Sequence, residues 1–108
     1  MRSPNGLRRA NDPPVLILTS LAGGAKHGHA LLKDIESFAG VRLGAGALYG
    51  AITRLEERGL IEALESDDRR RPYRITVAGT RALASVVADM RDLASIGETR
   101  LKLNWGTS

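Results

Sequence analysis

The sequence predicts a mostly helical fold with one small β-hairpin, and three features lead to this prediction. An apolar stripe of helical spacing runs from Leu48 to Leu55 and stops at Gly59, a residue suited to end a helix. Two short segments of strand character follow, joined by a polar tip with three consecutive arginines at 69–71. A long helical pattern then begins at Val77. A helix that passes directly into an arginine-tipped hairpin is typical of a winged helix-turn-helix, here extended by a long C-terminal helix.

The composition is that of a single small domain. With 108 residues, of which 43% are hydrophobic, the chain can bury one modest core. It contains no run of about 20 apolar residues and no apolar segment near the N-terminus, so we expect neither a membrane span nor a signal peptide. The absence of cysteine excludes disulfides and fits the reducing cytoplasm, where we expect the protein to act. A net charge of +4 favours a polyanionic partner.

The N-terminal part is expected to hold an arm and two helices. Residues 1–12 are polar and carry several arginines, which predicts a flexible basic arm. Pro13-Pro14 presets the first turn of a helix that continues from Val15 to about Ala22. That helix is apolar nearly all round and should therefore be buried, in the domain or at a subunit contact. A second helix is predicted over about 28–39, closed by Gly40.

The third helix and the wing complete the predicted DNA-binding domain, residues 13–77. We expect the third helix to extend from about Ala45 to Arg58. Strands are predicted over about 60–65 and 73–77, with residues 66–72 as the polar tip between them.

The last helix is predicted to pack against the same helix of a second chain and so to form the interface of a homodimer. Thr76 is the expected N-cap, and the helix should extend to about Lys102, within a dimerisation segment of residues 78–104. Its apolar positions have coiled-coil-like spacing, and so small a domain cannot bury all of them. Gly97 weakens the helix by about 1 kcal/mol relative to alanine and marks a candidate kink or end. The expected dimer interface consists of Leu83, Val86, Val87, Met90, Leu93, Ala94 and Leu101.

If the apolar stripe of the third helix faces inward, the opposite face is open to a partner. At 100° per residue, Tyr49, Thr53 and Arg54 lie on or beside that outer face. The hydroxyls can donate to a phosphate or a base, and the Arg54 guanidinium can contact guanine or phosphate through two hydrogen bonds. We therefore expect these residues to bind double-stranded DNA. The alternative is a surface helix with an ordinary solvated arginine.

The tip of the hairpin concentrates positive charge. Arg69, Arg70 and Arg71 are consecutive, and Arg74 lies on the returning strand. Arginines in such a wing can bind phosphates or enter the minor groove, where the negative potential is strongest. We expect these four residues to extend the DNA-binding surface. Two aspartates precede these arginines. The alternative is therefore an exposed turn in which the aspartates neutralise the arginines.

No set of side chains typical of catalysis or metal binding is apparent in the sequence. His27 and His29 lack further ligand partners, so a capping or packing role is expected for them. Asp34 and Glu36 lie two residues apart on a helix and therefore point to different faces, unlike a catalytic pair. No nucleophile–base set or glycine-rich phosphate loop is present. We expect a non-enzyme without a metal or cofactor.

A series of short motifs follows in a fixed order along most of the chain, from about Val15 to Leu101. They are His27-Gly28, Leu48-Tyr49, Arg54-Leu55-Glu56, Gly59-Leu60-Ile61, the arginine-rich tip, Tyr73-Arg74-Ile75-Thr76 and Gly79. This combination resembles the PadR-like transcriptional regulators, and the single C-terminal helix is similar to the short form of that family. The resemblance implies a homodimer whose two recognition helices read a pseudo-palindromic site and repress nearby genes.

The chain also departs from the family pattern. His29 stands where the family usually has an aromatic residue, and Ala47 where it often has a threonine. Gly44-Ala45 replaces the usual Ser-Pro entry to the recognition helix, which therefore lacks a serine N-cap worth about 1 kcal/mol. Phosphate contacts by side chains at these positions are accordingly not carried over.

The resemblance further implies a response to a small aromatic or lipophilic effector. Trp105, near the end of the last helix, is the residue expected to line an effector pocket between the two chains. The alternative is a tryptophan that packs on its own core.

Three functions remain open at this point. The first is a homodimeric, sequence-specific DNA-binding repressor. The second is a winged helix that binds a protein partner and not DNA, although such a module has no need of the arginine-rich tip. The third is a ligand-binding sensor that has lost DNA binding.

Overall fold

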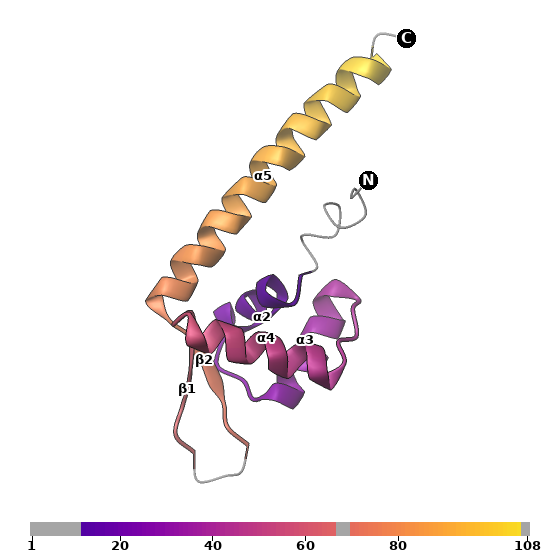
Figure 1. The fold of residues 1–108 in the computed structure, drawn as a ribbon. Coiled ribbons are helices and arrows are strands. Elements are labelled where there is room, and N and C mark those ends of the chain that lie inside the picture. The colour runs from indigo at the N-terminus through magenta and orange to yellow at the C-terminus, as the bar shows by residue number, and fades with distance from the viewer. Residues whose placement is uncertain (1–11, 67–69, 107–108) are drawn as a thin grey trace.

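The computed structural model describes residues 12–66 and 70–106, and the side chains within them up to residue 103. Its elements are α2 (Pro13–Ala22), α3 (Gly28–Ala39), α4 (Ala45–Glu57), β1 (Ile61–Ala63), β2 (Tyr73–Ile75) and α5 (Val77–Gly106). Figure 1 displays a helical body, a hairpin at one end and a long last helix that extends away from the body. This arrangement confirms the predicted winged helix-turn-helix with an added C-terminal helix. The predicted arm, apart from Asp12, lies outside the described residues.

The helix α2 is the centre of the core. Leu16, Ile17, Leu18 and Leu21 are all buried, as expected for a helix that is apolar nearly all round. Two prolines at its first positions preset the helical turn. Buried side chains from the neighbouring helices and the hairpin close the core around it, namely Leu31, Ile35, Leu48, Ala51, Ile52, Leu55 and Ile61.

The turn after α4 fixes where the hairpin begins. Gly59 has a left-handed backbone with φ of 73°, which a side chain would disfavour. Its N–H donates to the Glu56 carbonyl at 2.9 Å, and the Leu60 N–H donates to the Leu55 carbonyl at 2.9 Å. This pair of bonds is a Schellman motif, which ends the helix and satisfies its last carbonyls. The predicted helix end at Gly59 is confirmed.

The two strands are antiparallel and shorter than predicted. Ile61 pairs with Ile75 and Ala63 with Tyr73. One further hydrogen bond joins the Leu64 N–H to the Pro72 carbonyl at 2.8 Å, but proline has no N–H to return it, so the ladder stops. At the other end the chain leaves the sheet because Thr76 caps the next helix.

Paired hydrogen bonds between Lys26 and Tyr73 join the wing to the loop before α3. The Lys26 N–H donates to the Tyr73 carbonyl at 3.1 Å, and the Tyr73 N–H donates to the Lys26 carbonyl at 2.9 Å. Lys26 therefore acts as a one-residue third strand. Its ammonium group donates to the Ser20 carbonyl at 2.6 Å and lies 3.9 Å from Asp34, which accepts from the buried Ser20 hydroxyl at 2.6 Å. These contacts tie the loop before α3 to both α2 and α3.

Thr76 joins the last helix to the rest of the domain. Its hydroxyl accepts from the Gly79 N–H at 3.0 Å, which confirms the predicted N-cap of α5. The same hydroxyl donates to the Gly59 carbonyl at 2.7 Å, and the Thr76 N–H donates to the Leu60 carbonyl at 3.1 Å. The helix then continues through Gly97 to Gly106, so the prediction of a kink or end at Gly97 was wrong about the end. One unfavourable residue of about 1 kcal/mol does not interrupt a helix of 30 residues.

Candidate nucleic-acid interface

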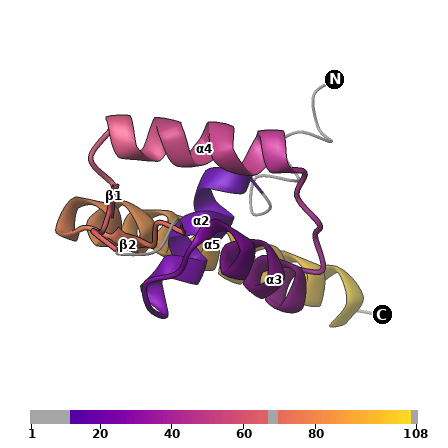
Figure 2. The same cartoon turned by 90° about the horizontal axis from the view of Figure 1, so that it is seen from below.

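The helix α4 lies on the outer side of the domain, with the hairpin near its C-terminal end (Figure 2). Leu48, Ile52 and Leu55 face inward and are buried, as the spacing predicted. Thr53 and Arg54 are exposed on the outer side. The Thr53 hydroxyl donates to the Tyr49 carbonyl at 2.9 Å, so its lone pairs remain for a donor such as a base amino group. Arg54 lies in the last turn, where a cation also stabilises the helix dipole.

The first half of α4 presents an unobstructed backbone. Gly44 is the N-cap and supplies no side-chain hydrogen bond, in keeping with the missing serine. A Cβ placed at Gly46 would meet no atom within 4 Å, and Ala45 and Ala47 are exposed. This end of the helix can therefore approach a groove wall closely.

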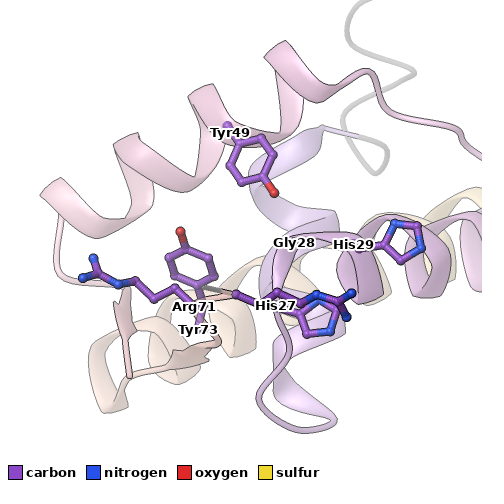
Figure 3. Close-up of a pocket in the computed structure, with 7 residues that line it drawn as sticks. His27, Gly28, His29, Tyr49, Arg71 and Tyr73 are labelled. Carbon is purple, nitrogen blue, oxygen red and sulfur yellow. The ribbon is translucent and has the colours of Figure 1, made fainter. Parts of the chain in front are cut away.

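A pocket of about 350 Å³ lies where α3, α4 and the wing meet. Figure 3 shows Tyr49 pointing from α4 toward the start of α3, with the Tyr73 hydroxyl directed toward α4 and Arg71 beside Tyr73. The pocket is lined by His27, Gly28 and His29 of the α3 end, Tyr49 of α4, and Arg70, Arg71 and Tyr73 of the wing. The pocket wall therefore includes two arginines and two tyrosines, and the Arg71 guanidinium extends past Tyr73, away from Tyr49 and His29 (Figure 3). Such a space suits an anion that accepts hydrogen bonds.

Gly28 determines the position of Tyr49, and burial determines the protonation state of Tyr73. Gly28 is buried, and a Cβ there would overlap the Tyr49 hydroxyl and ring, so only glycine leaves room for this tyrosine position. Burial raises the pKa of the Tyr73 hydroxyl above 10.0, and the nearby charges of Glu56 and Tyr49 act in the same direction, while Arg71 lowers it. Tyr73 consequently stays a neutral hydrogen-bond donor at physiological pH.

The two histidines have different positions. His27 is the N-cap of α3, and its Nδ1 accepts from the Ala30 N–H at 3.4 Å, which confirms the expected capping role. His29 is exposed and lines the pocket, a placement that the sequence analysis missed. Nothing local in the sequence indicates it, because the wing that completes the pocket lies about forty residues further along the chain.

The predicted cations of the wing do not share one environment. Arg70 and Arg71 reach the pocket, whereas Arg74 lies opposite Glu62 in the hairpin, with Nε and Oε2 2.6 Å apart. That ion pair offsets the charge of Arg74, whose contact with DNA stays a prediction. Arg69 lies outside the described residues.

The long helix α5 contains the second candidate interface. Leu83 packs against the core of its own chain, and Val86 and Met90 are half-buried. Beyond Met90 the apolar side chains are open to solvent, with exposed fractions of 71% for Leu93 and 58% for Leu101. Ala94 and Val87 are also exposed. Ile96 and Leu103, which the sequence analysis did not include, add to this exposed apolar surface.

In the part of the chain that the structure describes, no three histidine, cysteine, aspartate or glutamate side chains converge to hold a metal ion. Within those bounds, no helix combines the length and the apolar character needed to cross a membrane. The side chain of Trp105 lies outside the described set.

Three helices, an arginine-bearing hairpin beside an exposed third helix, and a long C-terminal helix define a winged helix-turn-helix protein of the transcription-regulator class. Residues 17–85 match the Transcriptional regulator PadR-like family over more than half of the chain. The protein belongs to the PadR-like family. A family of transcriptional regulators is not enzymatic, which confirms that part of the sequence prediction.

Solved structures of similar proteins share this fold. A PadR family transcriptional regulator from Eggerthella lenta is 29% identical, with a TM-score of 0.74 over 93% of this chain and 89% of that one. A PadR family regulator from Clostridium difficile is 22% identical, with a TM-score of 0.75 over 82% of this chain and 97% of that one. A transcriptional regulator from Clostridium thermocellum is 23% identical, with a TM-score of 0.74 over 88% and 93%.

A curated relative is more similar in sequence but much longer. An uncharacterized 37.1 kDa protein in transposon TN4556 of Streptomyces fradiae is 43% identical over 86 residues, which is 80% of this chain. The chain spans about a quarter of the length of that relative, 25%.

Proposed function

We propose that the protein is a homodimeric, sequence-specific DNA-binding regulator that represses transcription by occupying a pseudo-palindromic operator. The observation that carries this proposal is the position of α4, whose exposed face lies beside a wing that bears Arg70 and Arg71. An α-helix fits the major groove of B-DNA, and a wing beside it can reach the neighbouring phosphates. The net charge of +4 favours such a partner.

In this proposal the second half of α4 contacts the bases, and the first half lets the backbone approach the DNA closely. Arg54 has the guanidinium geometry to read guanine through two hydrogen bonds, and Thr53 can accept from a base amino group. The glycines and alanines at the start of α4 let the backbone approach DNA. Sequence preference should therefore depend on the second half of the helix.

The dimer follows from the exposed apolar surface of α5. A second copy of the chain is the occupant that would cover the equivalent residues of both helices, because two-fold pairing matches a surface with itself. Two α4 helices held by such a dimer would enter the major groove about 34 Å apart, which is one turn of DNA. A pseudo-palindromic site has the matching symmetry.

Replacing Arg70 and Arg71 together with alanine should weaken binding to all duplexes alike. Each phosphate contact releases counterions, so the slope of log affinity against log salt should flatten by about 1 per lost contact in each wing. The measurement is fluorescence anisotropy with labelled duplexes selected from a randomised pool, at several salt concentrations.

The matched control removes the same charge from a distant surface. Arg91→Ala with Lys102→Ala changes two exposed cations of α5 and should leave the salt slope unaltered. Arg54→Ala should instead change the preference between duplexes, because it removes a base contact. An unchanged slope in the wing variant would mean that the tip is merely solvated, and a wild-type protein without affinity for any duplex would favour a protein-binding winged helix.

A small lipophilic or aromatic effector is a further part of this proposal. A compound in a cleft between two α5 helices would regulate only through different affinity for two settings of the recognition helices. Titration of planar aromatic compounds should quench Trp105 fluorescence and release a selected duplex at the same concentrations. Quenching without release would contradict regulation, and no quenching would favour a tryptophan that packs on its own core.

A further inference from the structure

Ser20 is the one polar side chain that is buried among the described residues, with an exposed fraction of 2%. It lies in α2, whose other buried residues are all leucine or isoleucine. A buried hydroxyl is costly unless it is hydrogen-bonded, and this one donates to a carboxylate oxygen of Asp34 in α3 at 2.6 Å. Because the hydroxyl is closed to any substrate, its role lies in the structure around Asp34.

Lys26 joins the same cluster from the loop before α3. Its ammonium group donates to the Ser20 carbonyl at 2.6 Å and to the Gly24 carbonyl at 3.1 Å, and lies 3.9 Å from Asp34. Both carbonyls lie at or just beyond the C-terminal end of α2, where the helix dipole favours a cation. We call Ser20, Lys26 and Asp34 the Lys26 cluster, which links α2, the loop and α3.

The backbone of Lys26 contacts the wing at a strand position that has no other backbone partner in the hairpin. Bonding and non-bonding pairs alternate along two antiparallel strands, and the Leu64 N–H makes one of the bonds across this hairpin. The neighbouring pair, Ala63 and Tyr73, is therefore non-bonding. The N–H and C=O of Tyr73 point away from β1, and Lys26 bonds to both, at 2.9 and 3.1 Å.

We propose that the Lys26 cluster sets the position of the wing relative to α4 and thereby the affinity for DNA. This inference rests on the proposed function and adds positioning residues to it. A hairpin of two short strands is only marginally stable by itself. Thr76 holds the base of this hairpin, through its bonds to Gly59 and Leu60. Nearer the tip, the paired bonds with Lys26 hold β2 beside the helices.

The position of the wing matters because it bears Arg70 and Arg71. These arginines and α4 can contact the same duplex only when the wing lies at the right distance from the helix. If wings leave this position, the apparent affinity falls in proportion to the fraction that stays in place. With about a third of the wings in place in each protomer, a dimer would bind DNA about tenfold more weakly.

The first arm of the test measures the wing in the free, full-length protein. Lys26→Met keeps the length and the apolar stem of the side chain but removes its N–H donors. The Tyr73 N–H should then exchange with solvent within about tenfold of the rate of an unstructured peptide, as measured by NMR. The Thr76 N–H, which bonds at the base of the hairpin, should keep its wild-type protection. Ser20→Ala leaves Asp34 without its hydroxyl donor and should act in the same direction.

The second arm measures DNA affinity with a duplex selected from a randomised pool. Lys26→Met should bind it about tenfold more weakly than wild type. In a protein that already carries Arg70→Ala and Arg71→Ala, the same change should cause no further loss, because the wing no longer contributes. Lys33→Met is the matched control, since it removes the same charge from an exposed position of α3. It should change neither the Tyr73 exchange nor the affinity.

Four results would overturn the positioning role. The Tyr73 N–H could keep its protection in Lys26→Met, or Tyr73 and Thr76 could lose protection equally, which would mean that Lys26 only stabilises the whole fold. Tyr73 could lose protection while the affinity stays that of wild type. The affinity could also fall equally with and without the wing arginines. Failure of the wild type to bind any duplex would instead overturn the proposed function, and the exchange rates would still decide whether Lys26 holds the wing.

Discussion

Leu93→Asp should convert the protein from a dimer to a monomer at micromolar concentration. Leu93 is 71% exposed in the single chain, so the substitution costs the isolated protomer little. In a dimer that covers this surface, each chain would bury an unpaired carboxylate, at about 3 kcal/mol per chain. The two copies together would raise the dimer Kd by about four orders of magnitude. Sedimentation or light scattering distinguishes the wild-type dimer from a monomer of 11.6 kDa.

The control for this prediction is Ser95→Asp. Ser95 is two residues further along the same exposed helix and, at 100° per residue, lies on nearly the opposite face. It introduces the same charge and should leave the dimer intact. A wild type that is already monomeric would contradict the proposed assembly, and a Leu93→Asp protein that remains dimeric would place the interface elsewhere.

Gly79→Ala should destabilise the protein more than the same substitution at the other described helical glycines. A Cβ at residue 79 would lie 2.8 Å from Ile75 Cγ1 and overlap the Leu60 carbonyl. Because the Leu60 carbonyl belongs to the backbone and also accepts from the Thr76 N–H, it cannot move aside without breaking the junction between α5 and the hairpin. We expect a loss of about 3 kcal/mol in the free energy of unfolding, and a fall in Tm of more than about 10 °C.

The same substitution at Gly50 should have the opposite sign. Gly50 lies in the interior of α4, and a Cβ there would meet only the Arg54 guanidinium, at 3.8 Å. Alanine restricts the unfolded chain and favours the helix, which should raise the free energy of unfolding by about 0.5–1 kcal/mol. Denaturant unfolding of both variants at one protein concentration measures the difference. Equal stability of Gly79→Ala and wild type would mean that α5 is not seated on the Leu60 carbonyl.

The structural elements themselves could be predicted because their signals are local. The apolar stripe of α4, the glycine that ends it and the threonine that caps α5 each act within one helical turn. Their bounds therefore came close to the observed ones. The strands were predicted too long, because strand character in the sequence does not reveal that Pro72 ends the ladder or that Thr76 leaves it. The last helix was predicted to end at about Lys102, whereas it extends to Gly106.

The candidate site was predicted only in part, for the same physical reason. The outward positions of Thr53 and Arg54 follow from the helical period, and their exposure agrees with it. Which side chains meet across elements depends on distances that no local pattern specifies. Arg74 was grouped with the other wing arginines, yet the strand register places it against Glu62. His29 was assigned to capping or packing, yet it lines the pocket.

The sequence by itself determined the fold class, the family, the helix ends and the exposed face of α4, because periodicity, caps and motif order are properties of neighbouring residues. Only the tertiary structure decided the pocket, since Gly28 makes room for a tyrosine 21 positions later and the Lys26–Tyr73 pair holds the wing beside both. It also decided which part of α5 packs within its own chain. Leu83 packs on the core, and the apolar residues beyond Met90 are exposed. Contacts between side chains of different elements depend on the distances between those elements. These distances are set by the packing of the whole core.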